Sequence, residues 1–508
     1  MEDSLKKKFS AKVLSNVLTF AMSSVITILV PRSLGPSDYG NFSYLNHFFS
    51  KVFGFFSLGS LLAFFTKLSQ RPKEYKMIRF YVLFLLFVLV ISILFLTTIY
   101  ITGSEKLLLN EIKLQVIVLA FAYSFLLYLI NIVRQVNDAY GFTVMSEKFF
   151  MVQKLLSLLI VVSLYFFNAL NLVFYFVHLI LVLSLLLFTW IYYLDSQKIK
   201  PFAKVNRFSK FEVKKYISEF YTYSHPLFTL GAIALLLAIA ERWLLQYFGG
   251  SEEQGFYSFS FAITSIIFLF TGALAPLFTR DFSIAWGKKD FTHMRYLYNR
   301  FIPPLIALAS FFSFFVAANG EKIGLLLGGR LYANAGLSIA VMSVYPIHQT
   351  YGQLCGSVFF ASGKTKLMRN ISVPFNILGF CLTAFLLLPD KYGGLDLGSL
   401  GLVYKMVFIQ FLVVNFYLYH CSKILNVPFL ESMIKQIAII AAFAGLAFLV
   451  NMLFELVFDD IMLQLILSGF LYTILSVLMV VLFPTILVSS KRSELLELFN
   501  KILKKNKN

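Results

Sequence analysis

The sequence predicts an all-α integral membrane protein with about fourteen transmembrane helices, built as two pseudo-symmetric six-helix bundles followed by two C-terminal helices. Three observations support this prediction. Apolar runs long enough to cross a bilayer recur from Val13 almost to the end of the chain. Basic residues collect in every second connection between those runs. A motif that follows the first run returns in the second half of the chain.

The composition excludes water as the main solvent. Of the 508 residues, 59% are hydrophobic and 14% are charged, and the mean hydropathy is +0.79. A soluble chain of this length would divide into domains with polar surfaces. Cys355, Cys381 and Cys421 lie far apart inside apolar segments. Their spacing suggests neither a metal site nor a disulfide framework, and we expect no cofactor.

Windows of about 19 residues divide the apolar runs into individual spans. The predicted spans cover residues 13–31, 42–65, 78–101, 114–133, 149–167, 172–194, 220–248, 256–279, 299–318, 335–359, 370–389, 400–421, 433–456 and 462–489. The predicted domains are a first bundle at 1–194, a basic linker at 195–219, a second bundle at 220–421, two additional helices at 422–489 and a basic tail at 490–508.

The distribution of positive charge predicts the orientation. The net charge is +19, and most of the 44 Lys and Arg residues fall in alternate connections, such as 67–79, 198–215 and 280–300. Positive loops stay on the cytoplasmic side, which places both termini in the cytoplasm and requires an even number of spans. Short basic clusters between apolar runs argue against a nucleic-acid partner, which needs a continuous basic face. We expect the clusters to attract anionic heads of membrane lipids.

A ten-residue motif joins the first and second spans of each half. Residues 35–44 (GPSDYGNFSY) align without gaps to residues 250–259 (GSEEQGFYSF). In both copies a glycine, an acidic residue and a second glycine precede an aromatic-Ser-aromatic run. An even number of spans separates the copies, as a parallel repeat about an axis along the membrane normal requires. Two such bundles are typical of transporters that open by rocking.

Two segments resemble a known family. Asn16, together with residues 32–43 (RSLGPSDYGNFS), resembles the N-terminal motif of Wzx-type polysaccharide flippases. These belong to the multidrug/oligosaccharidyl-lipid/polysaccharide (MOP) exporter superfamily. Residues 241–249 (ERWLLQYFG) with 255–258 (GFYS) resemble that family's second motif. The acidic position of this motif is more often Asp than the Glu241 found here.

The resemblance implies a function. It implies a flippase of the bacterial plasma (inner) membrane that moves undecaprenyl-diphosphate-linked sugar outward by alternating access. The cargo would be a repeat unit of a polysaccharide such as capsule or the O-antigen of lipopolysaccharide. The implied partners are this lipid-linked oligosaccharide, H⁺ or Na⁺ as the coupling ion, and other proteins of polysaccharide assembly. Without the resemblance, the residues indicate only a transporter.

Ionisable residues inside spans are candidates for substrate contact, because a charge in the bilayer is costly. Lys51 lies about nine residues, or roughly 14 Å, into the second span, and it follows Asn46 and His47. We interpret Lys51 as a contact for pyrophosphate or an acidic sugar, with Asn46 and His47 beside it. The alternative is a lysine paired for packing. Lys154 in the fifth span is a further candidate, which could instead extend to the interface.

The seventh and tenth spans add further candidates. We interpret Arg242 as an anion contact and Glu241 as a proton or sodium site; structural ion pairing is the alternative for both. His348 is a second candidate for ion coupling, because histidine titrates near neutral pH. Gln349 and Gln353 could hydrogen-bond sugar hydroxyls or join helices.

Other functions stay open. A multidrug exporter of the same superfamily would be expected to carry a carboxylate cluster in its first spans, but the first two hold no Asp or Glu. A membrane-embedded polysaccharide polymerase or acyltransferase would need a larger external loop or a catalytic constellation. The sequence shows no nucleophile–base pair, phosphate loop or metal spacing. We therefore expect no enzyme and no catalytic residues. The repeat argues against a scaffold without transport.

Overall fold

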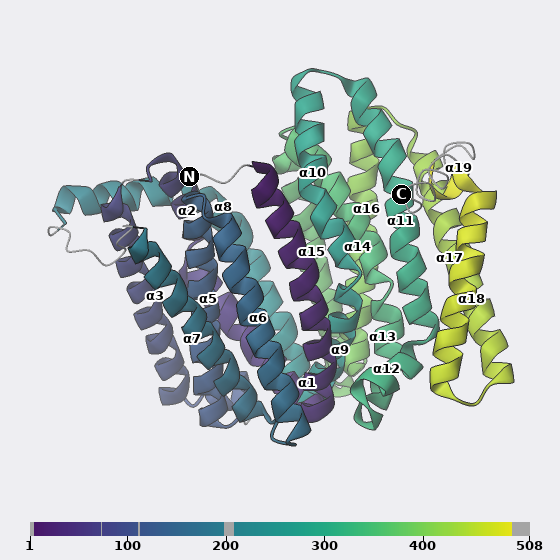
Figure 1. Cartoon of the computed structure of the whole chain (residues 1–508), viewed down its shortest axis with the longest axis horizontal. Helices are drawn as coiled ribbons and strands as arrows, with labels where there is room; N and C mark the ends of the chain where they lie inside the picture. The colour runs from purple at the N-terminus through teal and green to yellow at the C-terminus, as the bar shows by residue number, and fades with distance from the viewer. Residues whose placement is uncertain (1–4, 73, 110–111, 198–207, 490–508) are drawn as a thin grey trace, which may run out of the picture. The chain divides into compact units, whose positions relative to one another are not determined.

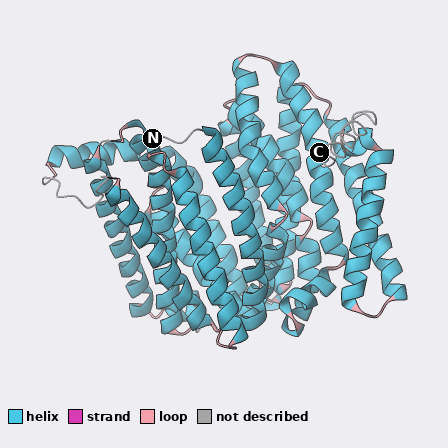
Figure 2. Ribbon diagram, viewed as in Figure 1, coloured by secondary structure: helices cyan, strands magenta, loops and turns pink. Residues whose placement is uncertain are grey.

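The computed structural model of the chain is helical throughout its described parts. It describes residues 5–72, 74–109, 112–197 and 208–489. These residues form α-helices with short 3-10 and π segments, and they contain no β-strand (Figure 2). The predicted basic tail and residues 198–207 of the predicted linker lie outside the described residues.

The helices group into two compact units, unit 1 (Met1–Gly255) and unit 2 (Phe256–Asn508). Figure 1 labels the helices in chain order. Unit 1 contains α1 (Leu5–Phe56), α2 (Ser60–Gln70), α3 (Tyr75–Ile101), α4 (Glu105–Leu108), α5 (Leu114–Ala139), α6 (Thr143–Phe166), α7 (Leu172–Ser196), α8 (Lys210–Leu244) and η1 (Leu245–Gly249). Helix α9 (Gly250–Ser265) begins in unit 1 and continues into unit 2. Unit 2 also contains α10 (Phe268–Gly287), α11 (Phe291–Ala318), α12 (Gly320–Gly328), η2 (Arg330–Ala335), α13 (Gly336–Met342), α14 (Tyr345–Ala361), α15 (Thr365–Leu387), η3 (Asp390–Tyr392), α16 (Gly398–Leu425), α17 (Phe429–Val457), α18 (Ile461–Leu482) and α19 (Pro484–Leu487).

The long helices confirm the predicted all-α membrane fold. Among the described residues, 11 candidate spans are long and apolar enough to cross a membrane. One candidate, Leu14–Phe56, holds both of the first two crossings, because α1 breaks at Gly35. Helices α9 with α10, and α13 with α14, occupy the predicted spans 256–279 and 335–359. Each of the about fourteen predicted spans therefore falls on one helix or on consecutive helices.

The second predicted span, 42–65, is interrupted in the structure. Helix α1 ends at Phe56, and α2 begins at Ser60. Between them Leu58 and Gly59 have φ values of 53° and 66°. The left-handed region is open to Gly59 and costly for Leu58, so this break is a strained turn in the middle of an apolar run.

Each unit has its own aromatic core. In unit 1 the buried rings of Phe49 and Phe53 pack against Phe121 at centroid distances of 5.4 and 5.3 Å. In unit 2 the ring of Phe311 stacks on buried Tyr472 at 5.1 Å. Ring pairs at these separations stabilise beyond the area they bury, and they give the spanning helices fixed neighbours on which polar residues can be positioned.

Candidate functional site

The two copies of the repeated motif have the same backbone at their first residue. Gly35 has φ 71° and ψ 172°, and the aligned Gly250 has φ 81° and ψ −179°. This combination is accessible almost only to glycine. Both glycines turn the chain directly before a new helical segment, so the repeat seen in the sequence is a repeat in structure.

The second glycine of each copy lies against the backbone of the other copy. A Cβ atom on Gly40 would lie 1.8 Å from the carbonyl oxygen of Ser251, and one on Gly255 would lie 1.9 Å from that of Pro36. In the alignment Gly40 corresponds to Gly255, and Pro36 corresponds to Ser251. The contact is therefore reciprocal: the motif packs on its own copy through backbone that only glycine permits.

Polar side chains reinforce this crossing. The side-chain oxygen Oδ1 of Asn41 accepts hydrogen bonds from Ser251 Oγ at 2.7 Å and from Gln246 Nε2 at 3.2 Å. Gln246 is completely buried, so this network is shielded from solvent and lipid. It fixes η1 and the start of α9 against the second segment of α1.

Arg242 is positioned by this arrangement. Its guanidinium donates to Ser43 Oγ at 2.9 Å, and it acts electrostatically on Tyr39, Tyr44 and His47 of α1. The neighbouring Trp243 donates from Nε1 to the carbonyl oxygen of Leu107 at 2.8 Å, which anchors this turn of α8 on its other side.

Three predicted site residues, His47, Lys51 and Arg242, come together here with Ser43, which was not predicted. Ser43, His47 and Lys51 are spaced four residues apart and therefore follow one face of α1. His47 lies within electrostatic range of both Arg242 and Lys51, and its buried Nδ1 has no hydrogen-bond partner in the described part of the chain. Among the described residues no carboxylate forms an ion pair with Lys51, which is half-buried. We call Ser43, His47, Lys51 and Arg242 the cationic cluster.

Two other predicted residues lie next to the cationic cluster. Asn46 is half-buried, and its side-chain oxygen accepts a hydrogen bond from Ser50 Oγ at 3.4 Å. Glu241 precedes Arg242 on α8 and is also half-buried. Successive helix residues point about 100° apart, so Glu241 and Arg242 lie on different faces of α8.

Lys154 lies elsewhere in unit 1. It acts electrostatically on His178 of α7. The imidazole of His178 contacts Ser157 Oγ at 3.0 Å and the carbonyl oxygen of Tyr175 at 2.8 Å. Lys154 thus lies near the polar contact between α6 and α7, and no hydrogen bond or ion pair among the described residues connects it to the cationic cluster.

The predicted polar residues of the tenth span lie on α14 in unit 2, and one of them bonds to α16. Gln410 of α16 donates from Nε2 to Gln349 Oε1 of α14 at 2.6 Å. The buried atoms His348 Nδ1, Gln353 Oε1 and Asn415 Oδ1 have no hydrogen-bond partner among the described residues. We call these five residues the amide layer. Its unused hydrogen-bonding atoms can bind a polar ligand or water.

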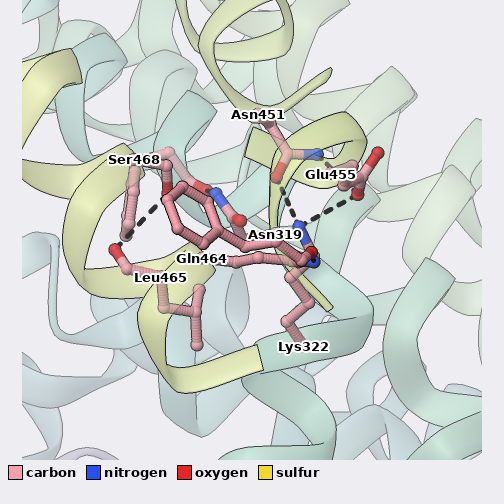
Figure 3. Close-up of polar contacts among 9 residues, drawn as sticks. Asn319, Lys322, Asn451, Glu455, Gln464, Leu465 and Ser468 are labelled. Carbon is pink, nitrogen blue, oxygen red and sulfur yellow. Dashed lines mark hydrogen bonds and ion pairs between the residues drawn. The ribbon is translucent and has the colours of Figure 1, made fainter. Parts of the chain in front are cut away.

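A further polar group in unit 2 is structural in character. Lys322 of α12 contacts Asn451 Oδ1 at 2.7 Å and Glu455 Oε1 at 3.0 Å, both on α17 (Figure 3). Asn451 also donates to Glu455 Oε1 at 2.9 Å. The Lys322 side chain is only 12% exposed. The three side chains form hydrogen bonds and an ion pair with one another, so the group joins α12 to α17.

Sequence reasoning missed several members of these groups. Gln246, Gln410 and His178 were not predicted as site residues. The sequence offered one signal for these residues, a polar residue inside an apolar run. Gln410, which lies five positions before the polar Asn415, is an example. Such residues usually join helices, and only packing shows which of them meet.

The fold is that of a multi-pass membrane protein, and it resembles solved transporters of the MOP superfamily. Lipid II flippase MurJ in an inward closed conformation matches with a TM-score of 0.63 and 13% identity, over 93% of this chain and 98% of that chain. An inward-facing multidrug resistance MATE family transporter of the MOP superfamily matches with a TM-score of 0.57 and 14% identity, over 81% and 95%. A MOP superfamily transporter from Pyrococcus furiosus matches with a TM-score of 0.52 and 14% identity, over 83% and 97%. These similarities establish the shared fold.

A family model assigns the chain within this class. The model described as polysaccharide biosynthesis protein matches residues 5–281, more than half of the chain. The chain belongs to this polysaccharide biosynthesis protein family. No curated protein sequence matches it at a significant level. The resemblance to MOP-type polysaccharide flippases is confirmed, and the similar structures are transporters and a flippase rather than enzymes.

Proposed function

We propose that the protein is a flippase for a lipid-linked oligosaccharide in a bacterial plasma membrane. The cargo is a polysaccharide repeat unit on undecaprenyl diphosphate, moved outward by alternating access. The family assignment supports a role in polysaccharide biosynthesis, and the fold shared with a lipid II flippase supports movement of a lipid-linked sugar.

The cationic cluster carries the proposal. A lipid-linked oligosaccharide needs positive charge for its pyrophosphate, while its polyprenyl tail can stay in lipid. Lys51 and Arg242 both act on His47, and Lys51 forms no ion pair with a described carboxylate. A cation within a span is costly unless an anion compensates it. The pyrophosphate of the substrate is the anion that we assign to this position, with Asn46 beside it for a sugar hydroxyl.

The amide layer is the proposed contact for sugars. Gln349 and Gln353 present the amide groups that hydrogen-bond hydroxyls, and their layer contains buried atoms without partners. Glu241 and His348 are the proposed coupling sites for H⁺ or Na⁺. Lys154 is a weaker candidate for the headgroup, because it lies near His178 of α7 and is not joined to the cationic cluster.

Substitution of Lys51 tests the proposed function. In Lys51→Ala cells the lipid-linked oligosaccharide is expected to accumulate at the inner leaflet, with export slowed at least about tenfold, because one charge-assisted contact is worth about 1.5–3 kcal/mol. Lys51→Arg keeps the charge and should retain most export. Protein levels and oligosaccharide in both leaflets are measured together.

Two outcomes would contradict the proposal. Normal export in Lys51→Ala cells at normal protein level would remove Lys51 from substrate binding. Unchanged oligosaccharide export after deletion of the gene, together with increased sensitivity to cationic drugs, would favour the multidrug exporter. A polymerase or acyltransferase would instead change the length or acylation of the polysaccharide without accumulation at the inner leaflet.

A further inference from the structure

The first part of α8 is a separate structural feature of unit 1. Its first three turns precede the candidate span Gly231–Ser265. Figure 1 shows this teal segment running crosswise to α3 and α7 before the chain turns into the spanning part of α8. Ser209 and Glu212 form a reciprocal capping box at its start. The segment is therefore a defined helix at one end of the bundle, and the charge distribution predicts that this end is cytoplasmic.

The inner face of this segment is held by ion pairs. Glu219 pairs with Arg71, and Glu212 pairs with Lys76 at the start of α3. The hydrogen bond from Lys76 holds the pKa of the Glu212 carboxyl below its usual range, so that this group is charged at neutral pH. Both carboxylates of residues 210–221 are thereby paired with cations beside α2 and α3.

The outer face has no exposed carboxylate and is dominated by lysines and large apolar side chains. Its exposed side chains are those of Lys210, Phe211, Lys214, Lys215, Ile217, Ser218 and Tyr221. Phe211 is 78% exposed, Ile217 55% and Tyr221 60%. Lysines interspersed with large apolar residues are the composition of helices that lie in the interface of anionic membranes.

One stripe of this face leads into a cavity. Lys210, Lys214, Ile217 and Tyr221 recur at helical spacing and share one side of α8. Ile217 and Tyr221 line a cavity of about 550 Å³. The rest of its lining comes from α2, α3, α8 and the turn before α2, and it includes Tyr81, Phe84, Phe220 and Ala232. The stripe thus runs from two ammonium groups into an aromatic-walled space.

We propose that this surface is a binding site for an anionic phospholipid of the inner leaflet. Lys210 and Lys214 bind the phosphate, and an acyl chain follows Ile217 and Tyr221 into the cavity. A phospholipid has an anionic phosphate at one end and acyl chains at the other. The two lysines at the start of the stripe match the phosphate, and the apolar cavity at its end matches an acyl chain. The site rests on the predicted orientation and is independent of the substrate proposed above.

Photo-crosslinking tests the proposal. The full-length protein is reconstituted in phosphatidylethanolamine vesicles containing phosphatidylglycerol with a photoactivatable group in its acyl chain, and crosslinked peptides are mapped by mass spectrometry. We expect crosslinks on α8 around Ile217 and on α3 around Phe84. The Lys210→Gln/Lys214→Gln variant should reduce them about tenfold, because each basic residue contributes to anionic-lipid binding.

Controls separate this site from general lipid contact. Lys288→Gln/Lys289→Gln removes two exposed lysines of unit 2 and should change nothing. Ala232→Phe fills the cavity and should remove the chain crosslinks. Lys51→Ala, which tests the proposed flippase function, should leave the crosslinks intact. Equal crosslinking along all lipid-facing helices, or crosslinks insensitive to both the lysine and the Ala232 variants, would overturn the proposal.

Competition distinguishes the source of the lipid. Unlabelled phosphatidylglycerol should displace the probe, whereas phosphatidylcholine should not. Undecaprenyl diphosphate has the same combination of anionic head and hydrocarbon chain. If it displaced the probe and phosphatidylglycerol did not, the site would belong to the lipid carrier, and the phospholipid assignment would be wrong.

Discussion

Gly40 and Gly255 are the positions at which unit 1 should tolerate least change. A methyl group on Gly40 would overlap the backbone of Ser251, which cannot move as a flexible side chain does. We expect Gly40→Ala to destabilise the protein by about 3 kcal/mol or more, because overpacking against backbone leaves no local relaxation. Thermal unfolding of the detergent-solubilised protein measures this effect.

Gly231→Ala is the matched control. Gly231 is also helical, and a Cβ atom there would meet nothing within 4 Å. Alanine has the higher helix propensity, so this variant should be as stable as the original protein or slightly more stable. Equal midpoints for the two alanine variants would mean that the crossing of the two motifs is not as close as described.

The residues of the cationic cluster were predictable to a large extent. Lys51 and Arg242 stand out because charge in a span is rare and costly, and both could be found without knowing the fold. The residues that surround them in the structure could not be predicted from the sequence. That His47 lies within electrostatic range of both, and that Lys154 lies within range of His178, depends on how the helices rotate and pack, which a nearly uniform apolar sequence does not encode locally.

At the scale of elements, Lys322 is expected to attach the C-terminal helices. Its ammonium group makes two contacts to α17 and is largely buried. We expect Lys322→Met to destabilise the protein by about 1–2 kcal/mol, because Asn451 and Glu455 lose a charge-assisted partner. Hydrogen exchange should increase in α17 and α18 and remain unchanged in unit 1.

Lys106→Met is a suitable comparison for Lys322→Met. Lys106 lies in the short α4 of unit 1 and is exposed, so its loss should have little effect. Equal exchange in α17 and α18 for both variants would show that Lys322 does not hold this hairpin.

Apolar length predicted where helices run but did not predict how they begin or break. The turn at Leu58 and Gly59 lies inside an apolar run, and hydropathy averages across it. Helix α8 begins well before the predicted span 220–248. Here a local signal existed, because Ser209 and Glu212 have the spacing of a capping box. A search for helix starts would have found this segment.

At the scale of the whole molecule, the orientation is a testable prediction. We expect cysteines at Lys106 and Asp459 to react with a membrane-impermeant maleimide in intact cells, and cysteines at Ser69 and Lys289 to react only after permeabilisation. All four positions are exposed, so access depends on the side of the membrane. The variants are made in a Cys381→Ser background, because Cys381 is the exposed native cysteine.

The opposite labelling pattern would invert the orientation. It would also move the proposed phospholipid site of α8 to the outer leaflet. Labelling of Lys106 and Ser69 from the same side would contradict the alternation on which the even span number depends.

The membrane topology of this protein could be predicted from its sequence because the features that indicate it recur along the chain. Alternating charge and long apolar runs report topology over hundreds of residues, so errors at single span ends do not accumulate. The family assignment agrees with the motif resemblance at residues 32–43. The substrate cannot be predicted in this way, since it depends on a few side chains such as Lys51 and Gln353 and not on a recurring pattern.

The reciprocal contact of the two motif copies also has an evolutionary consequence. Gly40 fits against Ser251 as Gly255 fits against Pro36, so a gene duplication would have produced both halves of this joint at once. After the duplication, a substitution at either glycine would require a change in the other copy. A relative that carries a bulkier residue at one of these glycines should show a compensating change in the other copy, and the two positions should covary across homologues although more than two hundred residues separate them.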